Sequence, residues 1–220
     1  MKGMTPTSPS RRHPAGTNPQ LRTRILEGAN AVFLEKGFDA AGVNDICRAA
    51  GISKSTLYVY FDNKEELFEA MVEQRRDAML DTVARPLRGD GPVRAQLSAF
   101  LSTLVTVLCS AEVIRAQRII IGIAERMPDL GARFYDGGAN RSQSVLAAYL
   151  ETRVAAGELA IARPKQAAYQ LIEMAGAGLV RQRLFSYRTE PPLPEEVTAS
   201  VESALDMFLA ACAVPPRPPG

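Results

Sequence analysis

Apolar residues recur along most of the chain at the three- and four-residue spacing of amphipathic helices. No stretch shows the sustained alternation of apolar and polar residues that is typical of strands, and no internal repeat is visible. The pattern therefore predicts an all-α protein of about nine helices. A small N-terminal three-helix domain followed by a larger helical body fits this pattern best.

The most informative segment is the pair of short helices predicted over residues 43–50 and 54–60. Four apolar residues share one face of the first helix, and Gly51, which adopts positive φ without steric cost, follows it. Ser53 is a suitable N-cap for the second helix, whose buried side would hold Leu57 and Phe61. Two short helices around a glycine-bearing turn are the signature of a helix-turn-helix.

Helices are also predicted on both sides of this pair. Asn18 and Pro19 fit the N-cap and first position of a helix that ends at Gly37. A longer helix over residues 64–84 leaves the pair and is expected to connect it to the second domain. The body should then contain helices over residues 93–108, 112–127, 128–156 with a kink or break at Gly137–Gly138, 164–185 and 195–213. The helix over 112–127 is apolar on much of its circumference and is expected to be central.

These elements divide the chain into four parts. Residues 1–17 are rich in Pro, Ser and Thr and are expected to be a disordered tail, although Arg11 and Arg12 leave open a contact with a DNA minor groove. Residues 18–64 form the predicted helix-turn-helix domain and residues 65–213 the helical regulatory and dimerisation domain. Residues 214–220 are a Pro-rich tail.

The balance of charged residues differs between the N-terminal part and the rest of the chain. Residues 1–64 hold nine Lys and Arg against five Asp and Glu, whereas the remainder holds seventeen against nineteen. A basic N-terminal part suits nucleic acid bound at one end. The sequence has no apolar run of membrane-spanning length and no signal-peptide pattern, so we expect a cytoplasmic protein without membrane partners.

Candidate chemistry is sparse. The only histidine, His13, lies in the N-terminal tail, which argues against a Ser-His-Asp triad, a Cys-His pair or a histidine-based metal site. No catalytic residue, metal or cofactor is predicted, and an enzyme is not expected. Cys47, Cys109 and Cys212 lack metal-ligand spacing and are expected to be buried thiols, with a redox-sensing pair left open.

The segment over residues 36–72 resembles the DNA-binding domain of the TetR family (TetR/AcrR-like) of bacterial transcriptional regulators. The matching motifs are Lys36-Gly37-Phe38, Ala49-Ala50-Gly51-Ile52-Ser53, Leu57-Tyr58-x-Tyr60-Phe61 and Lys64-Glu65-Glu66-Leu67. The resemblance covers roughly the first third of the chain. One departure is Gly42, which stands where the family usually has Thr or Ser to cap the first motif helix.

The resemblance implies that the second motif helix lies in the major groove of double-stranded DNA. Carried over position by position, it implies the DNA-contacting residues Asn44, Ser53, Lys54, Ser55, Thr56, Tyr58, Tyr60 and Lys64. Lys54 and Lys64 would neutralise phosphates, whereas Ser55 and Thr56 are short enough to meet base edges. Thr56 packed inside the domain, and Tyr58 and Tyr60 as core aromatics, are the alternatives.

The resemblance further implies a homodimer through the last two helices, around Ala175-Gly176-Ala177-Gly178 and a stripe formed by Val197, Val201, Ala204, Leu205, Phe208 and Cys212. The alternatives are that this stripe packs only within its own chain and that the glycines make room for a ligand. The resemblance also implies a small-molecule effector bound among Met71, Phe100, Leu104, Leu108, Arg118, Ile121, Phe134 and Met174. Arg118 and Glu125 are either polar anchors for that ligand or an ion pair or surface residues. The expected function is a ligand-responsive repressor of a palindromic operator. The alternative is an activator, or a DNA-bound scaffold whose body binds another protein.

Overall fold

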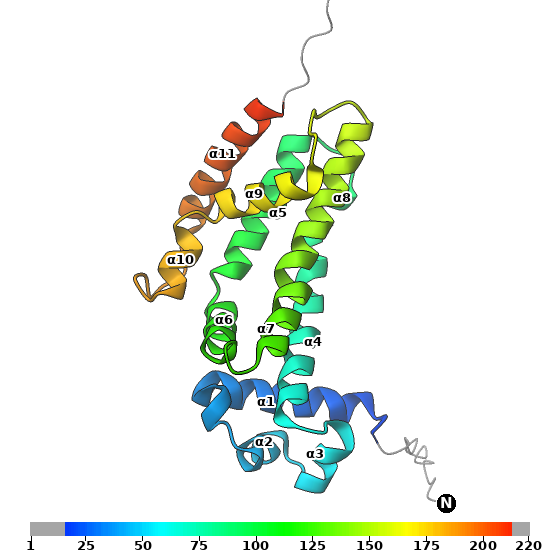
Figure 1. The fold of residues 1–220 in the computed structure, drawn as a ribbon, viewed down its shortest axis with the longest axis vertical. Coiled ribbons are helices and arrows are strands. Elements are labelled where there is room, and N and C mark those ends of the chain that lie inside the picture. Colours follow the sequence, from blue (N-terminus) through cyan, green and yellow to red (C-terminus); the bar gives the residue numbers. More distant parts are fainter. Residues whose placement is uncertain (1–15, 213–220) are drawn as a thin grey trace, which may run out of the picture. The chain divides into compact units, whose positions relative to one another are not determined.

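The structure is a computed structural model that describes residues 16–212 (Figure 1). Within these residues it contains eleven α-helices, two short helical turns and no strand, which confirms the all-α fold class. The chain forms two compact units, residues 1–71 and 72–220. The division falls inside α4 (Lys64–Ala84), whereas the sequence placed the domain boundary at the start of that helix.

The first unit contains α1 (Pro19–Ala40), α2 (Val43–Ala50), α3 (Lys54–Tyr60) and the first residues of α4. The side chain of Asn18 caps α1 by accepting a hydrogen bond from the Leu21 amide at 3.1 Å, and the helical path is interrupted at Gly37. The core contains three phenylalanine rings whose centroids lie 5.0–5.7 Å apart, supplied by Phe33, Phe38 and Phe68. The core thus joins α1 to the start of α4.

The crossing of α1 and α2 depends on a glycine. A Cβ atom at Gly28 would lie 2.8 Å from the backbone nitrogen of Ala50 and 2.9 Å from its Cβ. Next to this contact, Arg24 donates to the carbonyl oxygens of Ala50 and Gly51, which satisfies acceptors at the C-terminus of α2. The end of α2 is therefore held against α1 by backbone proximity and by one guanidinium.

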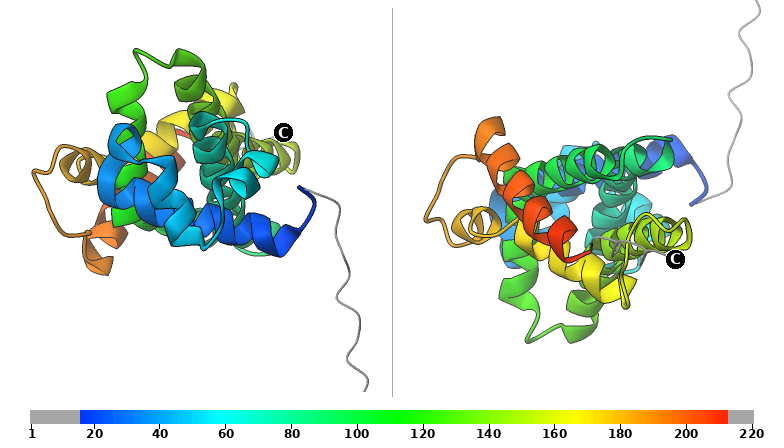
Figure 2. Two further views of the ribbon diagram at one scale, coloured as in Figure 1. Left: turned by 90° about the horizontal axis from the view of Figure 1, so that it is seen from below. Right: turned by 90° about the horizontal axis from the view of Figure 1, so that it is seen from above.

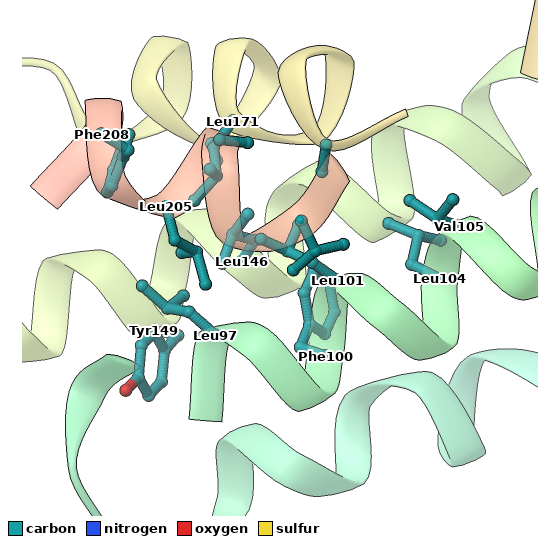
Figure 3. Packing of buried hydrophobic residues seen from close by; sticks show 14 of the residues in the cluster. Leu97, Phe100, Leu101, Leu104, Val105, Leu146, Tyr149, Leu171, Leu205 and Phe208 are labelled. Carbon is teal, nitrogen blue, oxygen red and sulfur yellow. The ribbon is translucent and has the colours of Figure 1, made fainter. Parts of the chain in front are cut away.

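The second unit is built around α5 (Val93–Leu108), α8 (Arg141–Ala155), α9 (Pro164–Ala175) and α11 (Pro194–Ala211). Figure 2 shows α11 lying beside α5 and α9. Large apolar side chains from all four helices fill the space between them, among them Leu97, Phe100, Leu101, Leu146, Leu171 and Leu205 (Figure 3). The remaining elements are η1 (Arg85–Arg88), α6 (Ala111–Ile123), α7 (Pro128–Tyr135), η2 (Asp136–Asn140) and α10 (Leu179–Leu184).

The kink expected at Gly137–Gly138 is present as a π-turn, η2, between α7 and α8. The guanidinium of Arg76 from α4 lies directly against Gly137 of this turn, in the space that a Cβ atom there would occupy. The neighbouring residues of α4 also form ion pairs: Arg75 with Glu112 at 3.0 Å, and Asp77 with Arg141. Three consecutive residues of α4 are thus attached to α6, η2 and α8 through polar groups and backbone contact.

Two sequence predictions about the body are wrong. The helix expected over 164–185 breaks after Ala175, because Gly176–Gly178 form a turn in which Gly178 has φ +78°. The helix α6 is shorter than expected and is not central: Ile114, Ile120 and Ile123 are buried, whereas Ile121 is 59% exposed. The break after Ala175 and the separation of α7 from α8 at η2 together explain why the structure has eleven α-helices where the sequence predicted about nine.

Among the described helices, none is by itself long and apolar enough to cross a membrane. α5 and α6 reach that length and composition only as a pair, bent by 62° at the break between them.

The substitution Gly28→Ala should destabilise the first unit. The added methyl group meets backbone atoms of Ala50, which cannot move aside as a flexible side chain does, and such overpacking costs about 1–3 kcal/mol. Urea unfolding followed by circular dichroism measures the effect. Gly122→Ala in α6 is the matched control: nothing lies within 4 Å of its Cβ, and the change should stabilise by about 0.5–1 kcal/mol. Equal changes in the free energy of unfolding for the two variants would contradict a requirement for glycine where α1 and α2 cross.

The substitution Glu202→Gln should reduce stability at neutral pH and much less in acid. The Ser98 hydroxyl donates to Glu202 at 2.6 Å and Arg94 pairs with it at 2.7 Å, which together lower the pKa of this carboxyl. A carboxyl with a lowered pKa in the folded state stabilises it above about pH 4, and this contribution is lost as pH falls further. Urea unfolding at pH 7 and pH 3 measures the difference between wild type and variant, and Glu151→Gln on the exposed face of α8 controls for the lost charge. If the difference in free energy of unfolding between wild type and Glu202→Gln were as large at pH 3 as at pH 7, the stabilising role of the ionised Glu202 would be contradicted.

Candidate functional site

The exposed face of α3 carries hydroxyl groups and one ammonium. Ser53 caps the helix by accepting from the Thr56 amide at 3.1 Å, and its hydroxyl lies 2.8 Å from those of both Ser55 and Thr56. Lys54 and Ser55 are exposed and Tyr58 is 51% exposed, whereas Thr56 is half-buried. Leu57 is buried, as expected, and so is Phe61 directly after the helix. The outward side of α3 therefore presents donors and acceptors, while its apolar side serves the core.

A second polar surface lies on α2. Asn44, implied by the resemblance, is exposed, and Arg48 one turn later has a side chain that is 79% exposed. Residues four apart lie on one helix face. Arg48 was not among the predicted residues, although its spacing from Asn44 was visible in the sequence. Its nearest acidic partner is Asp45 at 3.4 Å, and Lys36 at 2.7 Å lowers the pKa of Asp45.

Gly42 occupies the N-cap position of α2 and forms no side-chain hydrogen bond to the helix. The departure that the sequence revealed therefore leaves this helix end without a side-chain cap. A Cβ at Gly42 would lie 3.4 Å from the carboxylate of Asp45, which is in the first turn of α2 where an acidic group is favourable.

Two of the residues implied as DNA contacts are engaged within the protein. The hydroxyl of Tyr60 accepts from the amide of Asn18 at 3.2 Å and donates to its carbonyl at 3.4 Å. The ammonium of Lys64 donates to the carbonyl oxygens of Phe38 at 2.8 Å and of Asp39 and Ala41 at 3.4 Å, and lies 4.5 Å from the ring centroid of Phe38. In this structure both side chains connect elements of the first unit.

The eight candidate effector residues are not brought together as one lining. Phe100 and Leu104 are buried in the core of the second unit, and Leu108 and Met174 pack against that core. Phe134 is half-buried in α7, and its carbonyl accepts from Arg76 at 3.5 Å. Met71 is buried but belongs to the first unit. These six remain candidates.

The other two candidates lie elsewhere. Ile121 points to solvent, as described above. Arg118 is exposed and donates to the carbonyls of Leu184 at 2.9 Å and Arg183 at 2.6 Å, and to the hydroxyl of Ser186 at 2.8 Å. It therefore caps the C-terminus of α10. Glu125 is also exposed, which favours the surface interpretation of this pair of charges.

Of the residues implied in dimerisation, those of the apolar stripe pack within their own chain, which was the alternative interpretation of the stripe. The apolar stripe of α11, from Val197 to Phe208, is buried within its own chain, and Cys212 after the helix is buried as well. Ala175 is also fully buried, and Gly176–Gly178 form a turn instead of a close-packed helix face. The large apolar side chains that remain exposed on or next to these helices are Tyr169 on α9 and Phe185, Tyr187, Leu193 and Met207 around α10 and α11.

The turn that carries three of these side chains is held by arginines. Arg183 is buried and donates to the carbonyls of Cys109 at 3.0 Å and Arg188 at 3.2 Å, and to that of Thr189. Arg188 in turn donates to both carboxylate oxygens of Glu196, at 2.7 and 2.6 Å. Such charge-assisted bonds fix the path of the chain after α10 while its aromatic side chains stay in solvent.

The three cysteines are buried, and burial raises the pKa of each thiol. A raised pKa keeps the thiol protonated and poorly reactive. Within residues 16–212, no group of three or more His, Cys, Asp or Glu side chains is arranged to hold a metal ion.

Two protein-family models match the chain. The model of bacterial regulatory proteins of the tetR family matches residues 25–71, and that of the AefR-like transcriptional repressor C-terminal domain matches residues 95–214, more than half of the chain. The transcriptional regulator UidR of Escherichia coli (strain K12) is 40% identical over 68 residues, which are 31% of this chain and 35% of UidR. The transcriptional activator FasR of Mycolicibacterium smegmatis (strain ATCC 700084) is 35% identical over 80 residues, 36% of each chain. The chain thus spans about a third of the length of these curated relatives.

Solved structures extend the similarity over nearly the whole chain. A TetR-family transcriptional regulator from Mesorhizobium loti MAFF303099 has a TM-score of 0.82 and 26% identity, covering 89% of this chain and 98% of its own. The Flavonoid-responsive Regulator FrrA has a TM-score of 0.74 and 28% identity, covering 91% of this chain and 100% of its own. With the helix-turn-helix and the two model matches, these similarities show that the chain belongs to the TetR family of bacterial transcriptional regulators, which are DNA-binding proteins and not enzymes.

Proposed function

We propose that the protein is a repressor that binds a palindromic operator as a dimer and is released by a small, largely apolar effector. The observation that carries this proposal is the α2–α3 surface, which presents Asn44, Arg48, Lys54, Ser55 and Tyr58 to solvent. A short helix bearing such groups has the size and chemistry that a major groove accepts. Because it acts on bacterial DNA, its place of action would be the cytoplasm.

The surface residues divide by their chemistry. Lys54 and Arg48 carry the charges that would neutralise phosphates and release counterions. Ser55 and Asn44 are short polar side chains suited to base edges. Ser53 and Thr56 form one hydroxyl cluster with Ser55. Tyr58 would position the duplex through its phosphates. Tyr60 and Lys64 stay candidates for DNA contact only if binding releases the hydrogen bonds described above.

Dimerisation would cover the exposed apolar side chains around α10 and α11. Phe185 and Tyr187 are 78% and 84% exposed, and Met207 on α11 and Leu193 just before it are exposed as well. An exposed aromatic pair on a turn fixed by Arg118, Arg183 and Arg188 loses little freedom on binding, which favours association. A second copy is the proposed occupant, because regulators of this family typically form dimers. Two copies would present two α3 helices to the half-sites of a palindrome.

The effector proposal rests on the second unit and on a relative. FrrA, similar to this chain over nearly its whole length, is a flavonoid-responsive regulator. An effector releases DNA only if it binds the DNA-incompetent state better, by the coupling free energy between the two sites. The candidate contacts are Phe100, Leu104, Leu108, Phe134, Met174 and Met71, of which the first five belong to the unit that holds the middle of α4.

The sign of regulation has one specific alternative. The matching C-terminal family model describes AefR-like repressors, whereas FasR, similar in the N-terminal third, is an activator. An activator would use the same DNA-contacting residues. A scaffold that binds a protein partner would show no thermal shift with flavonoids or other small apolar compounds, whereas a ligand-responsive regulator would be stabilised by its effector.

Selection of bound duplexes from a random DNA pool should enrich an inverted repeat with half-sites about 34–36 Å apart. On that sequence, Lys54→Ala should lower the slope of log affinity against log salt by about 0.9, because one phosphate contact is lost. Lys64→Ala is the matched variant, and we expect it to lower thermal stability and leave the slope unchanged, because its ammonium is bound by backbone carbonyls. A lower slope for Lys64→Ala would instead assign the phosphate contact implied by the family resemblance.

The substitution Tyr187→Glu should convert the dimer to a monomer in sedimentation experiments at micromolar concentration, since an interfacial charge would have to be desolvated. The same variant should lose affinity for the full palindrome and keep the wild-type circular dichroism spectrum. Ile121→Glu, at an exposed position of α6, is the control and should remain dimeric. A dimeric Tyr187→Glu would place the interface elsewhere.

A further inference from the structure

We propose that Arg76 binds the anionic group of the effector, which is a small amphipathic acid whose carboxylate pairs with this guanidinium at the π-turn η2. The inference deepens the effector proposal above and rests on it, because it names the chemical class that the second unit would sense. Three observations support it: the hydrogen bonding of the guanidinium, the partners of the acidic side chains around it, and a glycine that makes room for it.

The guanidinium of Arg76 is shielded from water but poorly satisfied. The residue is half-buried, and its Nε atom is buried without a hydrogen-bond partner in the described part of the chain. Among residues 16–212 the guanidinium donates only to the carbonyl oxygen of Phe134, at 3.5 Å, which is longer than the usual range. A guanidinium has five N–H donors, and a buried donor on a charged group is destabilising without an acceptor. Arg76 can therefore gain hydrogen bonds from an added anion.

The acidic side chains around Arg76 are directed to other groups. Asp136 in the π-turn accepts a hydrogen bond from the side-chain amide of Asn140 at 2.6 Å. On α4, the adjacent residues Arg75 and Asp77 both form the ion pairs described above. Within residues 16–212, Arg76 thus lacks the carboxylate partner that each of its sequence neighbours has in its own ion pair.

The position of the guanidinium depends on Gly137. The guanidinium occupies the space that a Cβ at Gly137 would take, and the Arg76 Cδ lies 3.9 Å from the Cβ position at Gly138. Arg76 and the π-turn both belong to the second unit, where the turn separates α7 from α8 (Figure 1). π-turns are rare and are frequent at functional sites. Here the turn holds a cation against its backbone, where no side chain competes for the space.

The chemistry of this group defines the ligand class. A carboxylate accepts two parallel hydrogen bonds from a guanidinium, here from Nε and one Nη, and such charge-assisted pairs are short and strong. Partial burial strengthens the attraction, because less water screens it. Phe134, one of the candidate effector contacts, is half-buried and already bonded to Arg76 through its carbonyl. The arrangement fits a small monocarboxylate with an apolar body, whereas a neutral ligand of the same shape leaves the guanidinium unpaired.

Binding of the acid would also move α4. Because the Nε atom is covered in this structure, a carboxylate reaches it only when the guanidinium and the π-turn separate. That separation displaces the middle of α4 from the turn between α7 and α8. The acid therefore binds a second arrangement of α4 better than the one described here, and such differential affinity is what release of DNA requires.

Isothermal titration of the full-length protein with cinnamate and cinnamamide, and with octanoate and octanamide, tests the ligand class. The members of each pair have the same shape and differ in charge. We expect the wild type to bind each acid about ten- to a hundredfold more tightly than its amide. Arg76→Met, which keeps a long side chain without the charge, should lose this preference. Arg75→Met removes the same charge from the adjacent, ion-paired arginine and should keep it.

Thermal unfolding without ligand separates a ligand-binding arginine from a structural one. A shielded charge without an anionic partner destabilises the folded protein, so Arg76→Met should unfold at the wild-type temperature or a few degrees above it. A melting temperature several degrees below that of the wild type would show that Arg76 stabilises the π-turn, and would overturn the proposed role.

The outcomes distinguish this inference from the proposed function. Equal affinity of the wild type for acid and amide, no binding of either acid, or loss of the preference in Arg75→Met as well would overturn the acid site at Arg76. Release of the operator by neutral compounds would then still support an effector. Conversely, acids that bind through Arg76 and leave the operator complex intact in gel-shift experiments would establish the site and contradict the effector role.

Discussion

The close contact between Gly28 and Ala50 is the constraint on which the DNA-binding unit depends. Because Gly28 has no side chain, the backbones of α1 and α2 meet directly, and Arg24 closes the contact by binding the carbonyls at the end of α2. Gly51 then turns the chain in the left-handed conformation, and Ser53 starts α3. The direction of α3, and hence which of its side chains face solvent, therefore follows from this crossing and not from the residues that α3 exposes. The residues that fix the geometry, Gly28 and Arg24, are distinct from the outward residues of α3.

The polar side chains of this unit serve two purposes that composition alone does not distinguish. Lys54, Ser55 and Tyr58 are left to solvent, whereas Tyr60 and Lys64 are bound by backbone groups of Asn18 and of the α1–α2 connection. The sequence does not distinguish a tyrosine or lysine that contacts a DNA phosphate from one that stabilises the domain through internal hydrogen bonds. What decides is which backbone groups lie within reach in the folded unit. For Lys64 these are the carbonyls of residues 38, 39 and 41, which follow the interruption of α1 at Gly37, and for Tyr60 they are the amide and carbonyl of Asn18 at the start of α1. The proposed DNA surface is therefore limited to the side chains of α2 and α3 that the structure leaves exposed.

The sequence predicted those parts of the fold that depend on local rules. The residues predicted to start or stop helices do so in the structure: Asn18, Ser53, Gly51 and the prolines at 19, 128 and 164. The bounds of α2 to α5 also agree with the prediction. The failures share one cause, which is that tertiary packing decides them. The break after Ala175 requires Gly178 at positive φ, which small residues permit but do not demand. Likewise the stripe on α11 is apolar whether it faces a second copy or its own core, and here α5 and α9 cover it. The residue types restrict where a helix can break and which face can be buried, and tertiary packing determines which of the possibilities is realised.

The attachment of α4 within the second unit would suit transmission of a signal from the proposed effector. Its last residues, Val83 and Ala84, are buried, which fixes that end of the helix. Arg75 and Asp77 are instead held by ion pairs with the half-buried Glu112 and the exposed Arg141, and Arg76 lies against the π-turn. Exposed ion pairs contribute about 0–1 kcal/mol each. The coupling free energy by which effectors act is typically about 1–3 kcal/mol, the same order as the sum of these contacts. A ligand that repositions α7 or α8 therefore needs little differential affinity to shift the middle of α4. Apolar packing of that segment would have made the shift far more costly, since each buried side chain contributes about 1.5–3 kcal/mol.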